Sequence, residues 1–149
     1  MRLSTKGQYG LRAVVDLADR YGQGPIPLNT VAQREEISEH YLEQLMSQLR
    51  KAGIVVSIRG AQGGYQLARP PEEITIAEVI EILEGPIVPV DCLASDDGCS
   101  RSTICATQGL WKRLADAMQE VLGSTTLADL VEENQRIRRQ SQDGYMYYI

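Results

Sequence analysis

The chain has 149 residues, of which 43% are hydrophobic, and a formal net charge of −5 at pH 7. This length fits one domain, or a small domain with an appendage, that buries its own core without needing a disulfide or a metal. The opening Met-Arg-Leu-Ser-Thr-Lys forms no apolar signal segment, and no stretch reaches the ~18 uninterrupted apolar residues of a membrane span. These features argue against exported and membrane proteins, so we expect a cytoplasmic protein with no membrane partner.

The charge is distributed unevenly along the chain. Residues 1–70 carry nine Lys and Arg against six Asp and Glu, whereas residues 71–149 carry six against fourteen. A basic first part suits contact with phosphate, and an acidic second part suits sensing or dimerisation. The alternative is a random scatter of surface charge. We expect two domains, residues 1–70 and residues 71–149.

Three helices are predicted in the first part. Ser4 or Thr5 can cap a helix whose apolar stripe continues to Ala18, and a second, short helix is expected from Leu28 to Glu36. Ser38 can cap a third helix, residues 39–52, that ends before Gly53. Its buried side has apolar residues at helical spacing, namely Leu42, Leu45, Met46 and Leu49.

A β-hairpin is predicted directly after the third helix. Residues 54–58 are mostly β-branched, residues 59–64 form a glycine-rich turn, and residues 65–68 alternate apolar with small or polar side chains. Three helices followed by such a hairpin indicate a winged helix-turn-helix. The expected fold class is therefore mainly α with a small β-hairpin wing.

The second part contains helices separated by one irregular segment. Thr75 and Glu78 form a capping box for a helix that ends near Glu84. Residues 86–106 have no periodicity and read as a functional or disordered loop. A long helix from Thr107 to Leu122 has two adjacent apolar seams, which predict a dimerisation helix, with a role in the core alone as the alternative. A last helix is expected through Leu127, Leu130 and Val131, followed by an apolar tail, residues 145–149, that can dock.

The outward side of the third helix is the first candidate site. It carries Glu39, His40, Glu43, Gln44, Ser47, Arg50 and Lys51. In a helix-turn-helix such a surface enters the major groove, where Gln pairs with adenine and a carboxylate accepts a hydrogen bond from cytosine. Glu43 repels phosphate, so it fits only if it discriminates between sequences.

The predicted wing adds a second contact. Arg59 and Gly60 begin its turn, where the backbone can approach a phosphate and the guanidinium can enter a narrow minor groove. The alternative for helix and wing alike is an ordinary solvated surface. The two features together favour double-stranded operator DNA as the partner.

Three cysteines form the second candidate site. Cys92, Cys99 and Cys105 are separated by six and five residues, in the irregular segment just before a helix. A flexible loop with this spacing can wrap an inorganic core, and thiolates suit iron–sulfur clusters or zinc. The alternative is that the three cysteines are free thiols buried as small hydrophobic residues. This alternative fits poorly, because their sequence neighbours are Asp, Ser and Gly. The expected cofactor is an iron–sulfur cluster.

The fourth ligand of such a cluster is not evident. Gln108 can point back at the loop from the helix start, although an amide is a weak donor. His40, the only histidine, belongs to the expected DNA-facing surface. Asp91, Asp96 and Asp97 are alternatives. A cluster held by only three thiolates would be labile, which suits a sensor.

An enzyme or electron carrier is a weaker interpretation, because the chain lacks a paired base and nucleophile and a glycine-rich nucleotide loop.

Nearly the whole chain resembles the IscR/CymR/NsrR family of winged-helix transcription regulators. The matching segments are Met1 to Gly7, Ser38 to Arg50, and Ser57 to Gly60 running into Gly63, Gly64 and Tyr65. The resemblance implies a homodimer and a wing whose Arg59 enters the minor groove. It also implies a major-groove helix carrying Ser38, His40, Tyr41, Glu43 and Gln44.

Within this family, the three cysteines and residues 105–111 look most like IscR, which binds a two-iron two-sulfur (2Fe-2S) cluster and regulates cluster-assembly genes. Two features depart from it: the first cysteine gap is one residue longer, and Gln108 stands where IscR has a histidine ligand. In this interpretation, ordering of the cysteine loop repositions Glu43 and changes which operators are bound.

Two other members remain as alternatives. NsrR-like proteins sense nitric oxide and can recruit a carboxylate from the first helix, where this chain has Gln8. The body and the tail also resemble CymR, a regulator of cysteine metabolism that has no cluster and is controlled by a partner enzyme. A thiol sensor without metal is the last alternative.

Overall fold

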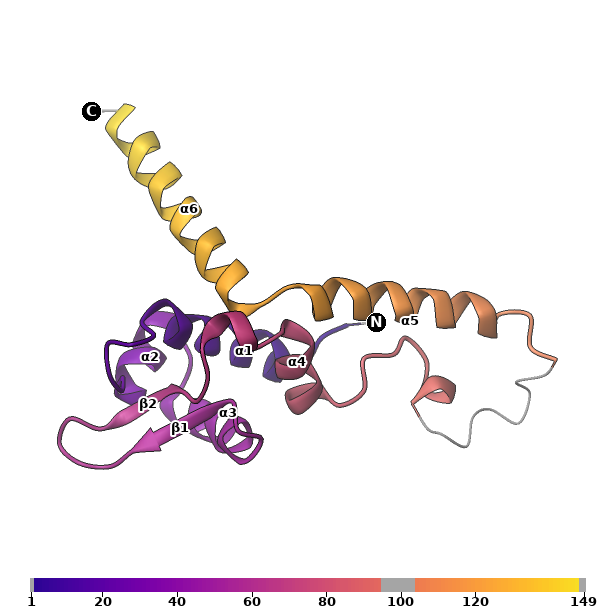
Figure 1. The fold of residues 1–149 in the computed structure, drawn as a ribbon, viewed down its shortest axis with the longest axis horizontal. Coiled ribbons are helices and arrows are strands. Elements are labelled where there is room, and N and C mark those ends of the chain that lie inside the picture. The colour runs from indigo at the N-terminus through magenta and orange to yellow at the C-terminus, as the bar shows by residue number, and fades with distance from the viewer. Residues whose placement is uncertain (1, 95–103, 148–149) are drawn as a thin grey trace.

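The computed structural model describes residues 2–94 and 104–147, which form six α-helices and one two-stranded hairpin. The elements are α1 (Thr5–Asp19), α2 (Leu28–Glu35), α3 (Glu39–Lys51), β1 (Val55–Ile58), β2 (Gly64–Leu67), α4 (Ile76–Glu84), α5 (Gln108–Ser124) and α6 (Leu127–Tyr147). Short 3-10 turns cover Pro71–Glu73 and Asp91–Leu93. In Figure 1, α1 to α4 and the hairpin form one unit, from which α5 and α6 extend as two arms. The prediction of a mainly helical fold with a hairpin wing is confirmed.

The helix starts follow the capping residues of the sequence in two cases out of three. The Ser38 hydroxyl accepts a hydrogen bond from the Tyr41 backbone N–H at 3.1 Å, which starts α3. Thr75 and Glu78 form the expected capping box at the start of α4. Ser4 is the N-cap residue of α1, but its side chain makes no capping hydrogen bond to that helix. A carboxylate from α4 takes that place, as described below.

The hairpin is fixed both to itself and to the chain before α2. β1 and β2 pair antiparallel, with Val55 opposite Leu67 and Ile58 opposite Gly64. Ile26 forms a further bridge to Tyr65, with N–H to carbonyl distances of 2.8 Å in both directions. The segment that connects α1 to α2 therefore holds the wing close to its turn, at the start of β2.

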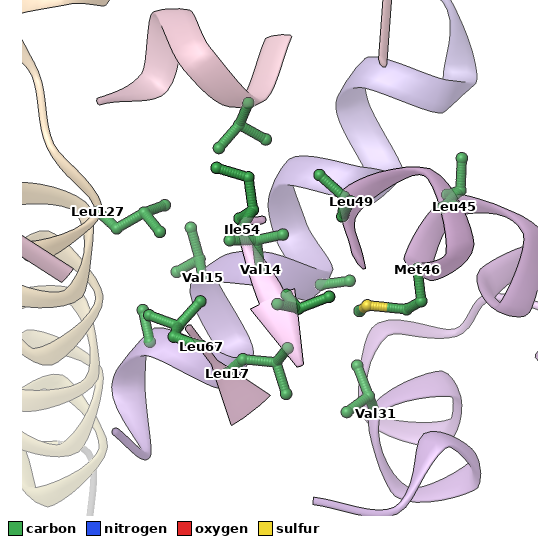
Figure 2. Close-up of a cluster of buried hydrophobic side chains, with 14 of the residues drawn as sticks. Val14, Val15, Leu17, Val31, Leu45, Met46, Leu49, Ile54, Leu67 and Leu127 are labelled. Atoms are coloured by element: carbon green, nitrogen blue, oxygen red, sulfur yellow. The ribbon is translucent and has the colours of Figure 1, made fainter. Parts of the chain in front are cut away.

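One hydrophobic core joins the helices to the hairpin (Figure 2). It takes Val14 and Leu17 from α1, Ile80 from α4, and four apolar residues from α3, namely Leu42, Leu45, Met46 and Leu49. Leu127, the first residue of α6, is completely buried in the same core. The core thus includes residues on both sides of residue 70, and the division into domains at that point stays a prediction.

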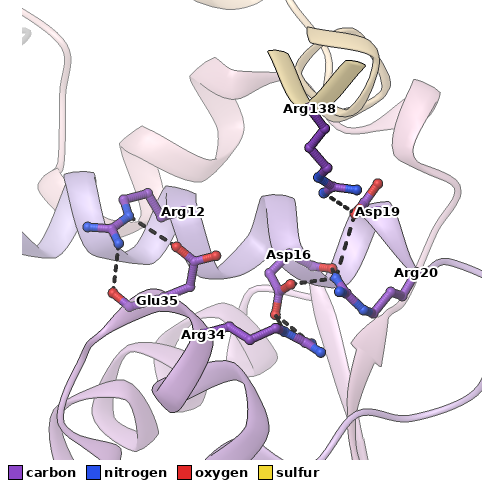
Figure 3. Close-up of polar contacts among 7 residues, drawn as sticks. All are labelled: Arg12, Asp16, Asp19, Arg20, Arg34, Glu35 and Arg138. Carbon is purple, nitrogen blue, oxygen red and sulfur yellow. Dashed lines mark hydrogen bonds and ion pairs between the residues drawn. The ribbon is translucent and has the colours of Figure 1, made fainter. Parts of the chain in front are cut away.

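A set of ion pairs holds α2 and α6 against α1 (Figure 3). Asp16 is 6% exposed, and its carboxylate lies 2.6 Å from the Arg20 guanidinium and 2.8 Å from that of Arg34 on α2. Asp19 pairs with Arg138 of α6. Because these carboxylates are nearly buried, their attraction to the arginines is screened less than that of a surface pair.

The last helix is longer than the sequence pattern predicts. α6 runs to Tyr147, far beyond Val131, through residues 132–144, which are mostly polar and exposed. An apolar stripe is the main signal of a helix in sequence, and this stretch has none. The predicted docking of the tail, residues 145–149, depends on side chains outside those that the structure describes, and it stays a prediction. Within those ranges no helix is long and apolar enough to cross a membrane.

Candidate nucleic-acid interface and cysteine segment

The two sides of α3 differ sharply in exposure. Its apolar residues are at most 1% exposed, whereas the opposite side is open to solvent. His40, Glu43, Gln44 and Arg50 are exposed there and Ser47 is half-buried; we call these five residues the recognition face. They combine hydrogen-bond donors and acceptors with a cation, and such groups read base edges and bind phosphates.

The first turns of α3 are locally ordered. Gln44 Nε2 lies 3.3 Å from His40 Nε2, one helical turn away. The exposed Ser38 hydroxyl already accepts the capping hydrogen bond from Tyr41 N–H. Ser38 therefore has a structural role at this position, and its contact with DNA stays a prediction.

The wing adjoins the recognition helix. α3 leads into β1 through a tight turn, in which the Ile54 N–H donates to the Leu49 carbonyl at 3.0 Å. Arg59 and Gly60 are exposed in the turn that follows β1. In Figure 1, α3 and the hairpin lie on the side of the unit opposite α6. Helix and wing can thus face one partner, while the α6 arm points away from it.

Two residues of α1 support the recognition helix, and the sequence analysis missed both. Thr5 Oγ1 lies 3.1 Å from the Tyr41 hydroxyl. The Tyr9 ring meets the Tyr41 ring edge-on, with centroids 6.4 Å apart. Thr5 and Tyr9 are four residues apart and so share one side of α1. Only their helical spacing was visible in the sequence, and spacing alone does not identify a partner 36 residues away.

Glu84 supplies the cap that Ser4 does not. Its Oε1 atom accepts hydrogen bonds from the backbone N–H groups of Ser4 at 3.0 Å and Gly7 at 2.9 Å, and from the Ser4 hydroxyl. The bond from the Ser4 side chain and those from the two backbone groups lower the pKa of Glu84 below its ordinary value, although partial burial opposes them. A negative charge at this position is also favoured by the dipole of α1.

The cysteine segment is described only at its two ends. Cys92 is half-buried in the 3-10 turn that follows Val90. Cys105 is half-buried, and its Sγ lies 3.2 Å from Thr107 Oγ1. Gln108 is the first residue of α5 and is half-buried. Cys99, Asp96 and Asp97 lie outside the described residues, so the predicted triad cannot be followed as a whole.

The residues present fit a cluster only incompletely. Within 2–94 and 104–147, no group of three or more His, Cys, Asp and Glu side chains could hold a metal ion. The described candidate donors are the thiols of Cys92 and Cys105, the exposed Asp91 carboxylate and the Gln108 amide. Since they form no metal-binding group by themselves, a cluster with about four ligands also needs Cys99.

α5 exposes an apolar side. No residue of α5 is buried among the described residues, and Leu110 and Val121 are 54% and 62% exposed. Beside it lies an apolar groove of about 580 Å³, lined by residues of α4, of the chain after it, and of α5, including Ile80, Ile87, Val88, Met118 and Leu122. Apolar surface of this extent on a separate arm is typical of an interface.

Comparison with known proteins gives one consistent result. The family described as "Rrf2: Iron-dependent Transcriptional regulator" matches residues 3–133. The chain is 48% identical to the HTH-type transcriptional regulator CymR of Bacillus subtilis over 149 residues, which is all of both chains. The solved structure of CymR, the global cysteine regulator of B. subtilis, has a TM-score of 0.76 and 49% identity, and the match covers 89% of this chain and 98% of that one.

The similarity to IscR proteins is lower. The solved structure of T. potens IscR has a TM-score of 0.74 and 42% identity, covering 90% of this chain and 88% of the other. IscR of Aliivibrio salmonicida is 38% identical over 135 residues, 91% of this chain and 80% of the relative. The expectation that the chain resembles IscR most is therefore corrected, because its identity to CymR is higher.

Proposed function

The chain belongs to the Rrf2 family of transcriptional regulators, and we propose that within this family it regulates genes of cysteine metabolism, as a CymR-like protein. The observation that carries the proposal is the 48% identity to CymR over the full length of both chains. The family consists of regulators and not of enzymes, as expected from the sequence.

DNA is contacted, in this proposal, by the recognition face in the major groove and by Arg59 in the minor groove. The exposure of His40, Glu43, Gln44 and Arg59 supports these roles. Helix-turn-helix proteins use the corresponding helix in the same way, and two copies read two half-sites about one helical turn apart. A homodimer formed through the apolar side of α5 would supply the second copy.

The DNA-binding part of the proposal is tested by selecting duplexes from a randomised pool with the wild-type protein. The selected duplex is then used to compare Arg59→Ala with Arg136→Ala, which removes the same charge from the exposed surface of α6. We expect the wing variant to lose about tenfold or more in affinity and the α6 variant to bind as wild type. Failure to select any sequence, or equal losses in both variants, would contradict the proposal.

The regulated genes are identified by the genomic fragments that the protein retains. We expect fragments upstream of genes for the synthesis or uptake of cysteine and other sulfur compounds. Fragments upstream of iron–sulfur assembly genes would instead favour the second candidate function.

That second candidate is an IscR-like regulator whose DNA binding responds to an iron–sulfur cluster, of the 2Fe-2S type. Three cysteines spaced over residues 92–105, in a chain matched by an iron-dependent family, favour it. Cys92, Cys99 and Cys105 would be ligands, with Gln108 as a weak fourth. Such a cluster would add a redox-active, acid-labile centre, and the thiolates would hold it beside the start of α5.

An anaerobic absorbance spectrum with iron and sulfide counts separates the two candidates. Red-brown protein with equal iron and acid-labile sulfide, lost when Cys92, Cys99 and Cys105 are changed to Ala, would support the cluster regulator. Protein that stays colourless after reconstitution would support the CymR-like function.

A further inference from the structure

The contact between α1 and the end of α4 is unusually close. A Cβ atom added at Gly7 would lie 2.6 Å from Glu84 Oε1, and one added at Gly10 would lie 2.3 Å from Leu83 Cδ1. Two glycines one turn apart thus let the helices approach until the Glu84 carboxylate reaches the backbone of α1. With its hydrogen bonds to Ser4 and Gly7, Glu84 fixes the first turn of α1 to the end of α4.

The same turn of α1 contacts the recognition helix. Thr5 lies between Ser4 and Gly7 in sequence, and its hydroxyl reaches the Tyr41 hydroxyl. Tyr9, in the next turn, packs against the Tyr41 ring. Tyr41 is two residues before Glu43 and three before Gln44. A shift of the first turn of α1 would therefore move the N-terminal half of α3, the part that enters the groove in a helix-turn-helix.

Glu84 also has a special place in the chain. It is the last residue of α4, and the segment after it leads in eight residues to Cys92. Gly85 follows with φ of 89°, so the chain turns away directly behind the carboxylate.

We propose that Glu84 is a positioning residue for DNA recognition, which acts through the first turn of α1 on Tyr41 and so on the recognition face. This inference rests on the proposed DNA-binding function. It assigns Glu84 no contact with DNA: the residue sets the position of α3 through Ser4, Thr5 and Tyr41.

The test is a double-mutant cycle in DNA affinity, with the duplex selected by the wild-type protein as the probe. Glu84→Ala should weaken binding on the order of fivefold to tenfold, the lower end of typical coupling between two sites. Glu84→Gln keeps one acceptor oxygen for Ser4 and Gly7, so it should recover part of the loss. Combined with Tyr41→Phe, Glu84→Ala should cost little more than either change alone, because both break the same route.

Two controls separate positioning from general damage. Glu84→Ala combined with Arg59→Ala should give losses that multiply, since Arg59 lies in the wing and outside this route. Glu78→Ala removes another α4 carboxylate, which caps α4 and pairs with Arg69 at 2.8 Å, and should keep wild-type affinity at a temperature where it is folded. Thermal unfolding monitored by circular dichroism establishes that temperature for each variant.

The possible outcomes are distinct. If the wild-type protein selects no duplex, the proposed function fails and this inference fails with it. If it selects one and Glu84→Ala binds equally well, or if the losses of Glu84→Ala and Tyr41→Phe multiply, only the inference is overturned. The inference is supported if Glu84→Gln recovers part of the DNA affinity and if the losses of Glu84→Ala and Tyr41→Phe do not multiply.

Discussion

Asp16 is a buried carboxylate whose charge is compensated by two arginines. Its side chain is 5% exposed and lies within 2.8 Å of both Arg20 and Arg34. Asp16→Ala would leave the Arg34 guanidinium without its carboxylate and Arg20 with only its longer pair to Asp19 at 3.6 Å, so we expect a loss of about 3 kcal/mol in the free energy of unfolding. This is the low end for a broken buried pair, because the arginine side chains keep 29% and 33% exposure and can rehydrate. Urea unfolding measures the loss.

A surface pair serves as the comparison for Asp16. Glu133 pairs with Arg136 on α6, where the two side chains are 48% and 52% exposed. Exposed pairs contribute little, because water competes for both charges. Glu133→Ala should therefore leave the urea midpoint unchanged. An equal effect of both substitutions would mean that burial does not decide the strength of these pairs.

The Glu84 cap makes part of the stability depend on pH. Hydrogen bonds from Ser4 and Gly7 lower the pKa of Glu84 below 4.5, its ordinary value. A lowered folded-state pKa means that this stabilisation is complete above pH 4.5 and is lost as the pH falls through the folded-state value. The difference in unfolding free energy between wild type and Glu84→Gln should thus be largest at neutral pH and shrink below pH 4.5. A difference that stays constant from pH 7 to pH 3 would contradict the assignment.

The residues that sequence could predict are those whose signal is local. The outward positions of α3, the Ser38 cap and the capping box of α4 depend on spacings of a few residues. By contrast, Glu84 is 80 residues from its partner Ser4, and Thr5 is 36 residues from Tyr41. In the sequence, each of these polar side chains resembles an ordinary surface residue. Such contacts depend on how helices pack, which no short sequence pattern records.

Among the elements, the wing contains glycines whose backbone is closely approached by other backbone atoms, and Gly64 is one of them. Gly64 has φ of 155°, and a Cβ there would lie 2.1 Å from the Ile26 carbonyl oxygen, which is backbone and cannot rotate away. Gly64→Ala should therefore cost about 2 kcal/mol or more and loosen the bridge between Ile26 and Tyr65. Chemical unfolding gives the cost, and hydrogen exchange at the Tyr65 N–H reports the bridge.

A second glycine provides the matched change. Gly123 lies in α5, and a Cβ there would meet nothing within 4 Å. Gly123→Ala should stabilise by about 0.5–1 kcal/mol, because alanine loses less conformational freedom in a helix. If Gly64→Ala also stabilised the protein, the close approach of Gly64 to the Ile26 carbonyl would not restrict this position.

Element prediction succeeded where an apolar stripe exists and failed where none does. The three helices of the winged unit and α4 each bury a recognisable stripe, and the hairpin has β-branched residues before a glycine-rich turn. α6 extends through polar residues such as Glu133 and Arg136, so only its first turns were predicted. Its start is fixed by the buried Leu127, whose N–H donates to the Ile74 carbonyl at 2.9 Å.

At the scale of the whole molecule, the arrangement of the arms follows from what each helix can bury. The winged unit has a closed core, to which α6 is attached through Leu127 and the pair between Arg138 and Asp19. α5 contacts mainly α4 and keeps its apolar residues half-buried or exposed. The wide apolar seam on α5 predicted a dimerisation helix, and its exposure agrees with a surface that a second copy covers.

Val121 tests this assignment directly. It is 62% exposed and lines the apolar groove beside α5, so burying it against a second copy would remove apolar surface from water. Val121→Asp places a charge that such an interface cannot solvate, and we expect a monomer in sedimentation equilibrium where the wild type is a dimer. The Val121→Asp protein should also bind the selected duplex more weakly, because a single copy reads one half-site.

Lys112→Ala, which changes the net charge by the same amount at another exposed position of α5, should remain dimeric. A Val121→Asp protein that is still a dimer would place the interface elsewhere.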